Sequence, residues 1–161
     1  MNLETWARIS EITASIAVLI TLVVLVFEVR ENTEAVKKSS YETLSNQLID
    51  WRLLMTTDPN LHRVFYTETR EGGEDWALEG EDRHVFQVYV QALWLIYEQA
   101  YYAYSYGDLQ ETEWQRFEET ICRRYVPEYI WTAPKSGTRT ILSPRFIAFV
   151  ESCRPDWQKG T

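Results

Sequence analysis

Few residues of this 161-residue chain have types and spacings that could support metal chemistry. A single Glu-x-x-His pattern, from Glu81 to His84, has the spacing that di-metal sites in helical bundles use in pairs. The other histidine, His62, follows Asp58 at a different spacing, so the pattern has no twin. We therefore expect Glu81 and His84 to be solvated side chains, and we predict no metal site and no cofactor.

The acid Glu98 lies in an apolar, tyrosine-rich stretch, and two interpretations of it are open. As an isolated buried acid it would contact a small ligand in an aromatic pocket that has one polar group. The residues of that candidate ligand site are Tyr97, Glu98, Tyr101 and Tyr102. As a structural acid it would bond to tyrosine hydroxyls or to an arginine such as Arg52, Arg123 or Arg124, and so join helices. We favour the structural network and keep the ligand pocket as the alternative.

The two cysteines, Cys122 and Cys153, form no C-x-x-C pair of the kind that binds metals or carries out redox chemistry. Their number permits one disulfide. Each falls on the apolar face of an expected helix, which favours two buried free thiols in a reducing compartment. No spacing pairs either thiol with a histidine, and the chain has no G-x-S-x-G, P-loop or dinucleotide-binding pattern. We therefore predict no enzymatic activity.

The net charge of -8 at pH 7 argues against nucleic-acid binding, which depends on basic side chains that neutralise phosphates. The acidic residues are densest from Glu68 to Asp82, where seven carboxylates and three glycines accompany the single Arg70. This composition is typical of a solvated loop. An acidic docking patch is the alternative.

The most apolar stretch runs from Ile12 to Phe27 and contains no charge. Extended to Ile9 and Val29, it reaches the about 20 residues that a membrane-spanning helix needs. The extension places Glu11 and Glu28 near the two interfaces, where a carboxylate costs far less than at the bilayer centre. We predict a transmembrane helix in residues 1–30. A buried soluble helix is the alternative, whereas a cleaved signal peptide lacks the basic start and the small-residue cleavage site.

Positive charges flank this span unequally. Arg8 and the free amine precede it, and Arg30, Lys37 and Lys38 follow it, which places the C-terminal part in the cytoplasm. Within the span, small or polar residues recur on one helical face, where they would let two helices approach closely. They are Ser10, Ala14, Ala17, Thr21 and Glu28. Self-association through this face, or a polar-lined pore, is a functional hypothesis; an ordinary anchor with small residues is the alternative.

The remaining pattern is helical. No proline or glycine precedes Pro59, so the first helix is expected to continue from Leu3 to Thr57, with the apolar seam from Tyr41 to Met55 forming one wall of a domain. Further helices are expected over 59–69, 84–107, a stretch around 112–125, and a last one that begins at Ser143 and Pro144. The segment 128–142 reads as an irregular loop.

These elements predict an all-α fold, in which an N-terminal transmembrane helix continues into a cytoplasmic helical bundle of about four to five helices. We expect an anchor in 1–30, an aromatic-rich domain in 31–154 that is rigidly coupled to the anchor, and a frayed tail in 155–161.

Several segments together resemble a group of bacterial single-span membrane proteins to which no activity is assigned. The resemblance rests on Phe27 to Thr33, Ser40-Tyr41, Tyr97 to Tyr102, Gly107, Trp114 and Ser143 to Phe146, and it covers most of the chain. Relatives in that group commonly have Gln at the position of Glu28. The resemblance implies a bacterial inner-membrane setting and a helical domain, and no function.

Three functional hypotheses follow from the sequence. The first is a membrane-anchored interaction module, or scaffold, that binds another membrane protein or its own copies, with the lipid bilayer as its other partner. The second is a membrane-tethered sensor of a small ligand, with the aromatic pocket around Glu98. The third is a subunit of a homo-oligomeric pore.

Overall fold

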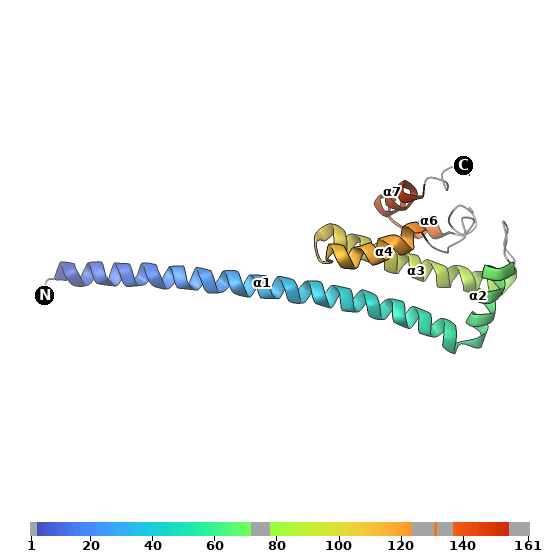
Figure 1. Cartoon of the computed structure of the whole chain (residues 1–161), viewed down its shortest axis with the longest axis horizontal. Coiled ribbons are helices and arrows are strands. Elements are labelled where there is room, and N and C mark those ends of the chain that lie inside the picture. The colour runs from blue at the N-terminus through green and yellow to red at the C-terminus, as the bar shows by residue number, and fades with distance from the viewer. Residues whose placement is uncertain (1–2, 72–77, 124–130, 132–136, 155–161) are drawn as a thin grey trace. The chain divides into compact units, whose positions relative to one another are not determined.

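The computed structural model of the chain describes residues 3–71, 78–123, 131 and 137–154. These residues contain helices and no strand, so the predicted all-α fold class is confirmed. In chain order the helices are α1 (Leu3–Thr57), α2 (Pro59–Glu71), α3 (Gly80–Tyr106), α4 (Glu111–Arg123), α6 (Thr138–Ile141) and α7 (Pro144–Cys153) (Figure 1). The chain divides into two compact units, residues 1–39 and 40–161.

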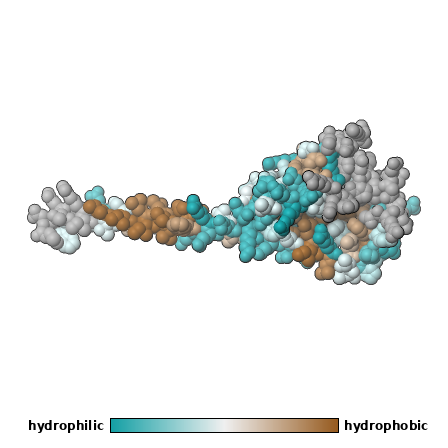
Figure 2. All heavy atoms as spheres, viewed as in Figure 1, coloured by the Kyte–Doolittle hydropathy of each residue, from teal (hydrophilic) through white to brown (hydrophobic). Residues whose placement is uncertain are grey.

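The first unit contains the N-terminal part of α1 and its apolar side chains. Among the described residues, α1 is the one helix that is long and apolar enough to cross a membrane. The large apolar side chains from Ile12 to Val29 are 49–62% exposed, and they form the brown surface of this unit in Figure 2. Among the described residues of this unit, no side chain covers these apolar residues, whereas a buried helix of a soluble core would be covered.

Local signals set the ends of three helices as the sequence predicts. Asp58 caps α2, because its Oδ1 accepts hydrogen bonds from the backbone N–H groups of Asn60 (2.8 Å) and Leu61 (3.2 Å). Gly107 ends α3 with a φ of 83°, a left-handed conformation that glycine adopts without strain. Ser143 caps α7, whose first residue is proline.

The second unit packs around α3, which contacts α2, α4 and α6. Its Trp94 is fully buried, and the rings of Tyr97, Trp131 and Phe146 contact it, as the aromatic composition predicts. The seam of α1 joins this core through Trp51, whose ring stacks on Tyr89 with centroids 4.3 Å apart. The Trp51 indole N–H donates to the Tyr89 carbonyl (2.9 Å), and the Tyr89 hydroxyl donates to the Trp51 carbonyl (2.6 Å).

The prediction of two free thiols is wrong. Cys122 in α4 and Cys153 in α7 form a disulfide, with their Cα atoms 5.5 Å apart, and no described cysteine is free. Both cysteines do lie on inward helical faces, but α4 and α7 contact each other, so the two faces meet. Because the two cysteines form a disulfide, they no longer support the placement of the domain in a reducing compartment.

The predicted environment of Glu68, a solvated loop, is also wrong. It is fully buried, and its Oε2 accepts a hydrogen bond from the Leu78 N–H (3.0 Å). Glu68 lies within the helix expected over 59–69, which extends to Glu71 as α2, so its position on the helix and not the acidic composition of the stretch sets its environment. It follows the buried Val64 by four residues and therefore shares its face. Residues 72–77 of the expected loop lie outside the described residues.

Two other boundaries differ from expectation. Helix α4 begins at Glu111, before the expected stretch around 112–125, and the Glu113 Oε2 accepts the Gln110 N–H (3.0 Å) at its start. The segment 128–142, expected to be irregular, contains the helical turn α6. The expected tail 155–161 lies outside the described residues.

Candidate functional site

Three of the four residues predicted to bind a ligand join α3 to α7. The Glu98 Oε1 accepts the Ser143 N–H (2.7 Å), and the Tyr102 hydroxyl bonds to the Ser143 hydroxyl (2.8 Å). Tyr101 stacks on Phe149 of α7, with ring centroids 5.0 Å apart. These contacts are of the structural kind that we favoured, although the partner of Glu98 is a backbone amide and not an arginine or a tyrosine hydroxyl.

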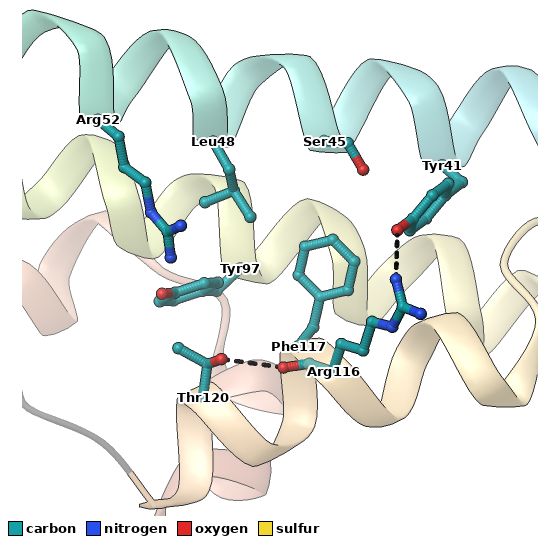
Figure 3. Close-up of a pocket in the computed structure, with 8 residues that line it drawn as sticks. All are labelled: Tyr41, Ser45, Leu48, Arg52, Tyr97, Arg116, Phe117 and Thr120. Carbon is teal, nitrogen blue, oxygen red and sulfur yellow. Dashed lines mark hydrogen bonds between the residues drawn. The ribbon is translucent and has the colours of Figure 1, made fainter.

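The fourth residue, Tyr97, lines a cleft that the other three residues do not line. This half-open cleft has a volume of about 180 Å³ and lies between α1, α3 and α4 (Figure 3). Its lining consists of Tyr41, Ser45, Leu48, Arg52, Tyr97, Arg116, Phe117 and Thr120. All eight residues belong to the second compact unit. Neither Glu98, Tyr101 nor Tyr102 lines it.

Two arginines give the cleft its charge. Arg52 extends from α1 and Arg116 from α4, and both are exposed. Arg116 Nη1 donates to the Tyr41 hydroxyl (2.9 Å), a contact between residues 75 positions apart. Within the described parts of the chain, neither arginine forms an ion pair, and no carboxylate lines the cleft. The cleft is therefore cationic in a chain whose net charge is -8.

Hydroxyl groups and one apolar stretch complete the lining. Leu48 and Phe117 lie between the two arginines in Figure 3. Burial raises the pKa of Tyr97 to about 12, although Arg52 and Arg154 act in the opposite direction. Tyr97 is therefore a neutral hydrogen-bond donor at physiological pH. Thr120 bonds to its own helix, through the Arg116 carbonyl (2.9 Å).

This arrangement suits the binding of anions. Guanidinium groups recognise carboxylates and phosphates through paired, charge-assisted hydrogen bonds. The lining includes no histidine, cysteine or carboxylate that would act as a nucleophile or a general base. The described residues contain no group of three potential metal ligands, and Glu81 and His84 lie exposed in the first turns of α3.

The predicted membrane-association face lies in the first unit. Ser10, Ala14, Ala17, Thr21 and Glu28 are all exposed on α1. The Thr21 hydroxyl donates to the Ala17 carbonyl (2.9 Å), so its polar group is satisfied within the helix.

No protein-family model, curated protein or solved structure matches the chain. The assignment of a site therefore depends on the residues themselves. Sequence reasoning missed the cleft because Arg116 and Thr120 lie on α4, which is distant from α1 along the chain. One signal was available: Ser45 and Arg52 both flank the apolar seam of α1 on the same side.

Proposed function

We propose that this chain is a membrane-anchored interaction module, in which one span holds a self-contained helical domain at a membrane surface. The supporting observation is the exposure of the apolar side chains of the first unit. Twelve Ile, Leu, Val and Phe side chains between Ile12 and Val29 are exposed. On an insertion scale they favour lipid by about 4–7 kcal/mol in total.

The polar groups of the span also suit a bilayer. The Ser15 hydroxyl donates to the Glu11 carbonyl (2.9 Å), one turn earlier in α1. The Thr21 hydroxyl donates in the same way to the Ala17 carbonyl (2.9 Å). A hydroxyl paired in this way needs no water, which is the requirement for a polar group in hydrocarbon.

We further propose a bacterial inner membrane as the setting, but two signals disagree about the side on which the domain lies. The flanking charges favour the cytoplasm by three positive groups to two, whereas the Cys122–Cys153 disulfide favours an oxidising compartment. We give the disulfide more weight, because the charge difference is a single group. Thiol alkylation of freshly lysed cells, with and without a reductant, shows on which side the domain lies. Labelling of Cys122 and Cys153 without the reductant supports the cytoplasm, and labelling only after reduction supports the oxidising side.

Charges placed at the middle of the span test the anchor. Leu19→Arg with Val23→Arg costs about 5–7 kcal/mol, which offsets the whole apolar gain. We expect this double variant to leave carbonate-washed membranes. The matched control is Ile49→Arg with Leu53→Arg, which has the same spacing on exposed positions of α1 in the second unit. Retention of the first pair in the membrane would contradict the proposal.

Self-association through the small-residue face is the second candidate. It is supported by the exposure of all five residues on one face of the span. We expect Ala14→Leu with Ala17→Leu to lower the native mass in mild detergent, whereas Val23→Leu with Val26→Leu on the opposite face leaves it unchanged. A monomeric parent protein would exclude both self-association and the pore.

The small-ligand sensor built around Glu98 is less well supported than these candidates. Its carboxylate already accepts the N–H of Ser143, the N-cap residue of α7, so a ligand there would have to displace that hydrogen bond. A sensor in this domain would more reasonably use the cleft that Tyr97 lines.

A further inference from the structure

We propose that the cleft between α1, α3 and α4 binds a small elongated dianion, with one anionic group at Arg52 and the other at Arg116. The chemical class is a short dicarboxylate or a molecule of the same length with phosphate at one end. This proposal concerns the second compact unit alone, and it stands whether or not the span crosses a membrane.

Charge is the first argument. Carboxylates outnumber basic groups in this chain by 24 to 16, yet no carboxylate of the described residues lines the cleft. Among the described residues, Arg52 and Arg116 form no ion pair. Within the described residues Arg116 donates to the Tyr41 hydroxyl, and a guanidinium has five N–H donors. Both arginines therefore retain donors for an incoming anion.

The separation of the two arginines is the second argument. Tyr41, which holds Arg116, and Arg52 are eleven residues apart on α1, or about 16 Å along a helix axis. Even after the side chains extend inward, one compact anion would not contact both guanidinium groups. Figure 3 shows them at opposite ends of the cleft, and a ligand with an anionic group at each end matches that placement.

The lining between the arginines is the third argument. Leu48 and Phe117 occupy the middle of the cleft, so the centre of the ligand is apolar (Figure 3). The volume of about 180 Å³ corresponds to about six waters at about 30 Å³ each. A dicarboxylate with a short methylene chain has a size of this order. Tyr97, protonated at neutral pH, donates a hydrogen bond near the Arg52 end.

Calorimetric titration of the full chain in detergent tests the proposal, with succinate, glutarate and adipate as dianions and with acetate and inorganic phosphate as compact anions. We expect one-to-one binding of at least one dicarboxylate, at least tenfold tighter than either compact anion, and weaker at high salt. Equal binding of compact and elongated anions, or no binding of any probe at millimolar concentration, would overturn the proposal.

Substitutions locate the site. Arg52→Gln and Arg116→Gln each remove one charge-assisted contact, and we expect each to weaken dicarboxylate binding about 10- to 100-fold. The matched control is Arg145→Gln, which changes an exposed arginine of α7 outside the cleft. Thermal melts of all three verify that the domain remains folded. If Arg52→Gln and Arg116→Gln bind like the parent, or if Arg145→Gln weakens binding as strongly as they do, the site is refuted.

Discussion

Replacement of Glu98 by alanine removes the carboxylate that accepts the Ser143 N–H at 2.7 Å. A hydrogen bond to a charged group contributes about 1.5–3 kcal/mol. Glu98 is partly exposed, so solvent weakens the interaction and the lower half of that range, about 1.5–2 kcal/mol, applies. For a domain of this size the melting temperature should fall by about 5–10 °C.

The substitution Glu98→Gln separates the contribution of the charge from that of the hydrogen bond. Its side-chain carbonyl still accepts the Ser143 N–H, and a neutral bond contributes about 0.5–1.5 kcal/mol, so most of the stability should remain. Melts followed by tryptophan fluorescence measure both variants, with Gln99→Ala as the control at the exposed neighbouring position. A Glu98→Ala protein that melts within about 1 °C of the parent would refute the structural role.

Two further perturbations test the domain. The Cys122–Cys153 disulfide joins residues that are 31 positions apart. The double substitution Cys122→Ser with Cys153→Ser should therefore lower the free energy of unfolding by about 3–4 kcal/mol in denaturant titrations. An unchanged denaturation midpoint would contradict the disulfide. Burial raises the pKa of Tyr89 and of Tyr97 to about 12 from 10.0, so the folded state holds these protons more tightly than the unfolded state does. Their contribution to stability is therefore full below about pH 10 and is lost as the pH rises through about 12. In alkaline melts, Tyr97→Phe should lose less stability over that pH interval than the parent does. A loss of stability equal to that of the parent would contradict the raised pKa of Tyr97.

Local signals were sufficient to predict most of the helix boundaries. A cap needs a few neighbouring residues, so Asp58 with Pro59 and Ser143 with Pro144 mark helix starts that the structure confirms. The aromatic core also followed from spacing, because residues three and four apart share a helical face. Glu68 was misplaced because its acidic neighbours indicate a solvated loop, although it lies within the expected helix 59–69 and four residues after the buried Val64.

Features that depend on contacts between distant helices could not be predicted in this way. The apolar faces of α4 and α7 were recognised, but their spacing does not show that Cys122 meets Cys153. The cleft depends on the contact of Arg116 with Tyr41 across 75 residues, which no local pattern encodes. The candidate site around Glu98 was placed in the correct helix, but three of its four residues contact α7 and not the cleft.

Hydrogen exchange of the full chain in lipid nanodiscs tests most directly whether α1 is a membrane anchor. The amides of Ile12–Phe27 and of Glu31–Val36 belong to the same helix, and the described side chains of both segments are exposed. Because both segments are exposed in the same helix, we expect similar protection of their amides without lipid. If Ile12–Phe27 lies in hydrocarbon, opening its amides leaves polar groups unsatisfied at several kcal/mol each, so its exchange should be at least a hundredfold slower. Equal exchange in the two segments would contradict the membrane anchor.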